Sequence, residues 1–158
     1  MIRILFTIFL LLGGAGAVSL GPYEIDYAAP GNAIWTPVAK SNITADGVAA
    51  RGYAGIVLAA DGWVLLILND FDEPVALSED DAFGMMKTAP VARVPVSIDG
   101  CETVLVSDGF FWRSVWTLQA DGWENGYMIG SDTVAVTMGG GWSRSDAVEF
   151  VESVRIGR

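Results

Sequence analysis

The stretch RVPVSIDGCETVLVSDGFFWRSVWTLQADGWENGYMIGSDTVAVTMGGG, residues 93–141, decides the fold of this chain. Runs of β-branched and aromatic residues in it alternate with short turn signals. These signals are Asp99-Gly100, Asp108-Gly109, Asp121-Gly122 and Gly130-Ser131-Asp132. Asp-Gly favours a type I′ hairpin turn, because Asp tolerates positive φ and Gly adopts it freely. The stretch therefore predicts five antiparallel strands in a meander, over residues 94–98, 103–106, 110–118, 126–129 and 133–138.

The strand predicted over residues 110–118 shows why this region should have a buried side. Its alternate residues Phe110, Trp112, Trp116 and Leu118 are apolar. The residues between them are mixed in character. Because successive side chains of a strand point to opposite faces, one face is expected to pack on a core and the other to be partly solvated.

Shorter strands are predicted before the meander. Residues 23–27 alternate and predict a strand, whereas residues 32–52 look irregular, with Trp35-Thr36-Pro37 extended because a residue before proline avoids the α region. A hairpin turns at Asp61-Gly62, and its returning strand, residues 63–68, is apolar on both faces. Such a strand is expected in the middle of a sheet that is covered on both sides.

Two helices complete the predicted fold. The first begins at the N-cap Ser78, with Asp81 three residues later, carries an apolar stripe and ends before Pro90. The second begins at Ser143 and ends near Arg155, whose charge suits a helix C-terminus. The apolar residues of the two stripes are Ala82, Met85, Met86 and Ala89, then Ala147, Phe150, Val151 and Val154. We therefore predict an α+β fold, an antiparallel β-meander sheet with two helices packed on it.

The N-terminal residues 1–17 resemble a signal peptide. Arg3 provides a positive charge, residues 4–12 are apolar, and Ala15-Gly16-Ala17 fits the A-x-A cleavage rule. We expect a mature chain that begins near Val18, a single domain over residues 18–158, and a periplasmic or secreted location, with no membrane attachment after cleavage. If the leader is retained, a subunit of a membrane complex is the alternative.

Composition excludes several functions. A formal net charge of −10 disfavours nucleic acid and anionic membrane surfaces, and leaves two interpretations, solubility or docking on a basic protein. The chain has no histidine, which removes the usual general base and metal ligand. Its one cysteine, Cys101, cannot form an intramolecular disulfide and is expected to be a small, half-buried apolar side chain.

The densest group of carboxylates begins in a predicted loop, residues 69–74, with Asp70, Asp72 and Glu73. It continues with Glu79, Asp80 and Asp81 at the start of the first predicted helix. The spacing resembles the start of an EF-hand, but Val75 stands at the sixth position, where glycine is needed, and Asp81 at the twelfth, where glutamate is needed. We therefore expect a solvated loop or a protein-docking surface, with no metal and no cofactor.

Tryptophans are the other candidate binding residues. Trp63 and Trp123 each follow an Asp-Gly turn, and Trp142 follows three glycines. Tryptophans at the edges of loops can form a stacking or docking surface. The alternative is that these three cap the ends of the core.

The order of elements resembles a known group of domains. A hairpin, a helix, a meander and a terminal helix closing on Val151-Glu152-Ser153-Val154-Arg155 look like the PsbP-like domains of cell envelopes and thylakoid lumens. The resemblance implies a small accessory or binding protein that is not an enzyme. It rests on element order alone and carries over no functional residue.

These observations lead to one expected function and two rivals. We expect a non-catalytic accessory, inhibitor or immunity-type protein that binds another envelope protein. The first rival is a module that binds a small ligand or sugar through its tryptophans. The second is a hydrolase that uses carboxylates alone, for which no spacing in the sequence selects a pair.

Overall fold

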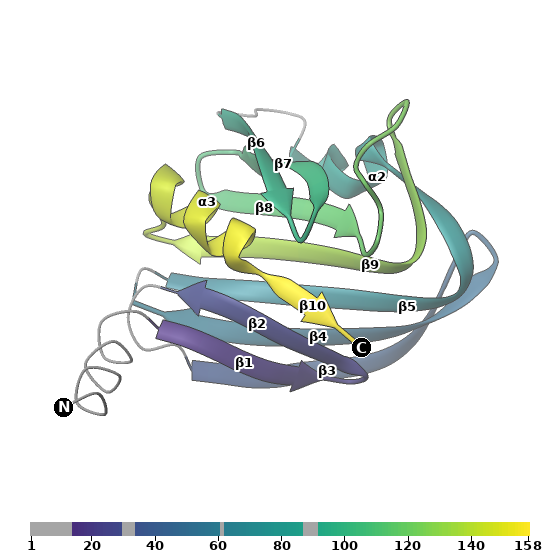
Figure 1. Ribbon diagram of the computed structural model, residues 1–158, viewed down its shortest axis with the longest axis horizontal. Helices are drawn as coiled ribbons and strands as arrows, with labels where there is room; N and C mark the ends of the chain where they lie inside the picture. The colour runs from purple at the N-terminus through teal and green to yellow at the C-terminus, as the bar shows by residue number, and fades with distance from the viewer. Residues whose placement is uncertain (1–13, 30–33, 61, 87–91) are drawn as a thin grey trace.

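A computed structural model describes residues 14–29, 34–60, 62–86 and 92–158. Two antiparallel sheets, one of seven strands and one of three, lie face to face (Figure 1). The terminal helix lies beside the small sheet, on the same face of the large sheet. Neither helix in these ranges is long and apolar enough to cross a membrane.

The large sheet contains, in spatial order, β3 (Ile34–Ala45), β4 (Val48–Ala59), β5 (Gly62–Ser78), β9 (Tyr127–Gly140), β8 (Phe111–Thr117), β7 (Cys101–Ser107) and β6 (Ala92–Ile98). The small sheet has β2 (Tyr23–Ala29) between β1 (Gly14–Leu20) and β10 (Arg155–Gly157). The helices are α2 (Glu79–Phe83), which continues into the 3₁₀ turn η1 (Gly84–Met86), and α3 (Arg144–Ser153). The predicted antiparallel sheet and the two helices are confirmed, but strands dominate, so the fold is mainly β.

The predicted meander exists, with one strand fewer. β6, β7, β8 and β9 are consecutive neighbours, but Gly130-Ser131-Asp132 does not form a turn, because β9 runs through it as one strand. The pairing of β9 with β5 shifts register there, from Val75↔Gly130 to Asp70↔Asp132. A methyl carbon of Thr117 lies 2.2 Å from the position that a Cβ on Gly130 would occupy. Gly130 thus permits a close approach between strands and does not end one.

The hairpin turns differ from the prediction in two places. Asp99-Gly100 is confirmed, with φ of 51° and 83°. Asp121-Gly122 does not form a hairpin turn. Asn125-Gly126 does, with φ of 50° and 81°, and the backbones of Glu124 and Tyr127 exchange hydrogen bonds across it.

At Asp108-Gly109, the second signal, a side chain forms the turn. Asp108 Oδ1 accepts hydrogen bonds from the backbone N–H groups of Phe110 and Phe111, each at 2.9 Å, and only Gly109 has positive φ. β8 therefore begins at Phe111. Phe110 is 80% exposed, so the prediction that it faces the core is wrong.

Two segments predicted to be irregular are strands. The first is residues 34–52, which belong to the β3–β4 hairpin that turns at Asp46-Gly47; residues 55–59 of β4 were predicted as a strand and are confirmed. The acidic segment 69–74 lies inside β5, where the register shift bends the strand. Trp35-Thr36-Pro37 is extended as predicted, and Pro37 with the adjacent register shift makes β3 a poor edge for further pairing.

The main core lies between the two sheets. Val64, Leu66 and Leu68 of β5 are fully buried on this face. They meet the small sheet and α3, whose buried side chains are Tyr23, Ile25, Tyr27, Ala147, Phe150 and Val151. We call this side of the large sheet the covered face.

A second, smaller core lies on the opposite side of the large sheet. Ala82, Phe83 and Met86 pack there against Val106 of β7 and Val115 of β8. Ser78 caps α2 as predicted, accepting a hydrogen bond from the N–H of Asp81 at 3.0 Å. Of the predicted apolar stripe, the Met85 side chain and Ala89 lie outside the described residues. β5 is central as predicted, but this helix packs mainly on β7 and β8 and reaches β5 at Leu77, near the end of the strand.

Candidate functional site

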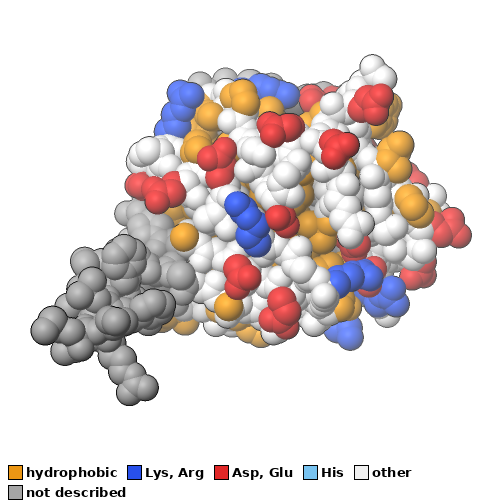
Figure 2. All heavy atoms as spheres, viewed as in Figure 1, with side chains coloured by type: hydrophobic (Ala, Val, Ile, Leu, Met, Phe, Trp, Pro, Cys, Tyr) orange, Lys and Arg blue, Asp and Glu red, His pale blue; other side chains and the backbone are white. Residues whose placement is uncertain are grey.

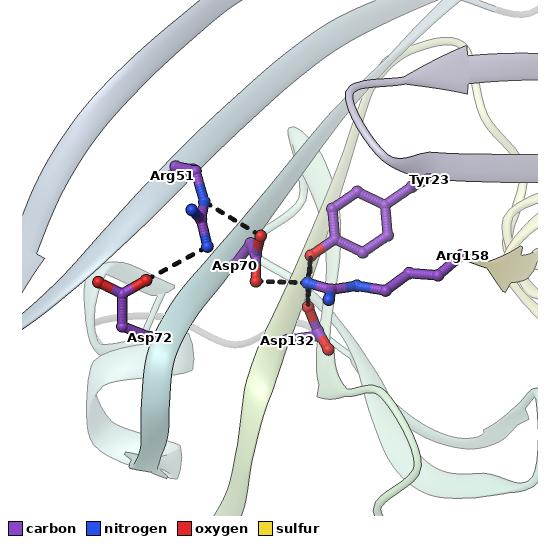
Figure 3. A network of polar contacts seen from close by, with 6 residues as sticks. All are labelled: Tyr23, Arg51, Asp70, Asp72, Asp132 and Arg158. Atoms are coloured by element: carbon purple, nitrogen blue, oxygen red, sulfur yellow. Dashed lines mark hydrogen bonds and ion pairs between the residues drawn. The ribbon is translucent and has the colours of Figure 1, made fainter.

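The acidic segment of β5 belongs to a charged network between the sheets (Figure 3). Asp70 is 7% exposed and is paired with Arg158 and, at 3.2 Å, with Arg51. Arg51 also binds Asp72 at 3.2 Å. Arg158 donates to Asp132 at 2.8 Å. We call the residues Tyr23, Arg51, Asp70, Asp72, Asp132 and Arg158 the charged hub.

Tyr23 connects the charged hub to the small sheet. Its hydroxyl donates a hydrogen bond to Asp132, and the Arg158 guanidinium lies 5.3 Å from its ring centre. Burial raises the pKa of Tyr23, and the nearby Asp132 carboxylate raises it further, although the hydrogen bond with Arg158 lowers it. The hydroxyl therefore stays protonated at neutral pH. The hub joins β2, β5, β9 and the end of the chain, so its first role is to hold the two sheets together.

The hub does not have the composition of a metal site. Within the described ranges, no group of three or more His, Cys, Asp or Glu side chains converges as a metal would require. Arginines already bind Asp70 and Asp72. Glu73, the third carboxylate of the predicted site, is exposed and lies apart from these contacts.

The three candidate tryptophans lie in different places. Trp142 is 7% exposed and packs edge-on against Phe150 with ring centres 5.5 Å apart, so it belongs to the core. Trp123 is half-buried, packs on Phe83 and donates its Nε1–H to Thr103 at 2.9 Å. Trp63 is half-buried on the face opposite the main core.

Trp63 belongs to an apolar surface that no helix or strand of the described residues covers. The register of pairing places Ile34, Leu58, Trp63, Gly139 and Phe111 in one row across five strands. Directly paired residues point to the same side of a sheet. Ile34 is 64% exposed, Leu58 52% and Phe111 42%. The surface, which we call the open sheet face, comprises Ile34, Ile56, Leu58, Trp63, Leu65, Ile67 and Phe111.

The opposite side of the molecule has a different character. Figure 2 views the side that carries the small sheet and α3, where charged side chains of both signs are interspersed. Contiguous exposed apolar surface is uncommon in monomeric proteins and marks interaction sites. The open sheet face is therefore the strongest candidate for a docking surface.

Trp123 lies in a groove of about 1080 Å³ beside the β8–β9 connection. Residues 118–126 fold back along β7, where the Glu102 N–H donates to Asp121 O at 2.8 Å. The groove is lined by apolar side chains and by four acidic ones, Glu79, Glu102, Asp121 and Glu124. We call it the Trp123 groove. Glu102, Asp121 and Glu124 were not among the predicted site residues, although the Asn125-Gly126 dipeptide could have located the hairpin that frames the groove.

Cys101 is more deeply buried than predicted. It is 2% exposed, and its Sγ lies 3.7 Å from Sδ of Met128. Burial raises the pKa of the Cys101 thiol to about 11, so the thiol is neutral and unreactive at pH 7. It serves as an apolar core side chain.

Comparisons with protein-family models, with curated proteins and with solved structures found no match. The resemblance to PsbP-like domains therefore stays a prediction.

Proposed function

We propose that this chain is a non-catalytic binding domain of the cell envelope or the secreted space, which docks on another protein through the open sheet face. One observation carries the proposal. β5 is apolar on both sides, and only the covered face is buried by the rest of the described chain.

Burial of the open sheet face by a partner would be favourable. Each Å² of apolar surface removed from water contributes about 25 cal/mol. The row from Ile34 to Phe111 is continuous because its members project from adjacent strands, and Gly139 adds no side chain between Trp63 and Phe111. The Trp63 indole fills this space, since its Cζ2 lies 2.3 Å from where a Cβ on Gly139 would be. A large aromatic side chain held in this way suits an interface anchor.

The test is capture of partners from the native envelope fraction by the tagged protein and two variants. Leu58→Asp places a charge in the middle of the open sheet face, and we expect it to abolish capture. Val38→Asp is the matched control, because Val38 is 55% exposed on the edge strand β3 and is not part of the face. Capture that survives Leu58→Asp, with the fold intact by circular dichroism, would contradict the proposal.

Secretion is a separate part of the proposal and has its own test. Residues 1–13 lie outside the described residues, and the expected cleavage site lies within β1. Cleavage after Ala17 would leave Val18, Ser19 and Leu20 paired with β2, and Leu20 is 3% exposed. We expect the intact mass of the native protein to match a start at Val18. A mass that begins at Met1 would contradict secretion by cleavage.

One rival retains a specific observation. Trp63 and Phe111 lie with ring centres 5.9 Å apart at the surface, an arrangement on which a sugar ring could stack. Quenching of tryptophan fluorescence by a sugar, lost in Trp63→Leu, would favour this rival. The charged hub does not favour the carboxylate hydrolase, since Asp70 and Asp132 are both bound by Arg158.

A further inference from the structure

We propose that the Trp123 groove binds an extended basic segment of a partner protein, in which Lys or Arg alternates with apolar residues. This is a second binding site, separate from the open sheet face. The proposal goes beyond general protein docking because it specifies the chemistry of the bound segment.

The floor of the groove is apolar and fixed in position. Trp123 is held from two sides, by its hydrogen bond to Thr103 and by Phe83, whose ring centre lies 6.0 Å away. Tyr127 and Ile129 of β9 also line the groove, and they are 51% and 67% exposed. Exposed large apolar residues beside a concave surface offer contact area to a ligand.

The rim of the groove is negatively charged, and among the described residues three of its four carboxylates have no basic partner. Glu79 is paired with Arg93 at 3.4 Å. Among the described residues, no basic side chain pairs with Glu102, Asp121 or Glu124, and no Lys or Arg lines the groove. The charged hub is the opposite case, because arginines bind its carboxylates. Unpaired charge of one sign around a concave surface attracts ligands of the other sign.

The shape favours a peptide over a small cation. The groove is open and, at about 1080 Å³, exceeds the range of roughly 300–1,000 Å³ typical of small-molecule sites. Side chains of an extended segment alternate in direction, so one set can face Trp123 and Ile129 while the other set meets the carboxylates. The acidic rim repels nucleic acid and anionic lipid.

The experiment measures binding of a labelled, end-blocked peptide of alternating lysine and leucine by fluorescence anisotropy. We expect saturable binding that weakens as salt increases. The triple variant Glu102→Gln, Asp121→Asn, Glu124→Gln should weaken binding at least tenfold.

The control triple variant is Asp26→Asn, Glu73→Gln, Glu149→Gln. It removes the same charge from exposed positions outside the groove, and binding should change less than twofold. Equal losses in the two triple variants would show attraction to net charge alone and overturn the proposal.

Two further measurements test the shape and the independence of the site. Ile129→Ser, a change at an exposed position, should weaken the peptide several-fold, whereas spermidine should compete only weakly. Competition by spermidine as strong as by the peptide would indicate a small-cation site and overturn the proposal. Leu58→Asp should leave peptide binding unchanged. If Leu58→Asp loses partner capture but the native protein binds no peptide, the groove proposal is refuted and the open sheet face stands. If the native protein binds the peptide but Leu58→Asp still captures the partner, the open sheet face is refuted and the groove stands.

Discussion

The two faces of β5 have nearly the same composition and different environments. On the covered face, Val64, Leu66 and Leu68 are fully buried. On the open sheet face, Trp63, Leu65 and Ile67 keep part of their surface in water, and the neighbouring Leu58 is 52% exposed. The difference comes from other elements. The small sheet and α3 cover one face, whereas α2 has five residues and packs mainly on β7 and β8 on the other, reaching β5 at Leu77 and β9 at Ala135. The apolar sequence of a strand thus indicates which of its faces can be buried, but it does not show whether the same chain buries them.

The largest expected effect on the free energy of unfolding comes from a truncation on the covered face, compared with the same truncation on the open sheet face. Leu66→Ala should destabilise the fold by about 2–5 kcal/mol, because it leaves a cavity in a fully packed core. Leu65→Ala, its neighbour on the open sheet face, should cost about 1 kcal/mol or less, because water already reaches the side chain. Urea unfolding measures both free energies. Equal losses would mean that the open sheet face is covered in solution, for example by a second copy.

The covered face should also determine stability at high pH. Cys101 is held neutral with a pKa of about 11, above its ordinary value of 9.0. Its contribution to stability is complete below pH 9 and is lost as pH rises to 11, because the unfolded chain releases the proton first. The loss is roughly 2 kcal/mol. Tyr23, whose pKa burial also raises, adds a loss above pH 10.

Cys101→Ala separates the two contributions. We expect the variant to be less stable at pH 7 and to lose less stability between pH 9 and pH 11 than the native protein. The measurement is urea unfolding at several pH values. An unchanged slope in the variant would show that the thiol does not carry the effect.

A turn beside the open sheet face should give a smaller effect. Gly109 has φ of 95°, which alanine resists, so Gly109→Ala should destabilise by about 1 kcal/mol. Gly84→Ala is the control, because Gly84 has φ of −57° and nothing lies within 4 Å of an added Cβ. The control should be neutral or slightly stabilising by thermal unfolding. A loss at Gly84 as large as that at Gly109 would contradict the explanation from backbone φ.

The smallest effect on stability should accompany a large effect on binding. Leu58→Ser on the open sheet face should change the free energy of unfolding by about 0.5 kcal/mol or less, as surface substitutions do. It should nevertheless reduce partner capture, because the face loses an exposed apolar side chain at its centre. A large loss of stability would show that Leu58 is needed by the fold and would weaken the case for an interface.

The sequence correctly predicted the features that depend on interactions between residues close together in the chain. The caps Ser78 and Ser143 were correct, because an N-cap side chain bonds to a backbone N–H only three residues away. The Asp99-Gly100 turn and the apolar stripe of α3 were correct for the same kind of reason. Residues 34–52 were missed, because their small and polar residues hide the alternation that identifies a strand, whereas residues 55–59, predicted as the first strand of the hairpin at Asp61-Gly62, are confirmed as part of β4.

The candidate site was less predictable. Asp70 and Asp72 were selected for their charge, but the partners that neutralise them, Arg51 and Arg158, come from other strands and from the far end of the chain. Asp132 was assigned to a turn because Gly130 precedes it. Trp142 was a candidate for its place after three glycines, yet it packs on Phe150. Nothing in the local sequence indicates these distant contacts.

The sequence by itself determined that this chain forms an antiparallel, strand-rich fold with two capped helices, because strand periodicity, turns and caps depend on residues within a few positions of each other. Only the tertiary structure decided which apolar face remained open, which carboxylates were neutralised and which tryptophan lined a groove. Those outcomes depend on contacts between segments up to 135 residues apart, such as Tyr23 and Arg158. The position of a segment in space is set by the packing of the whole chain.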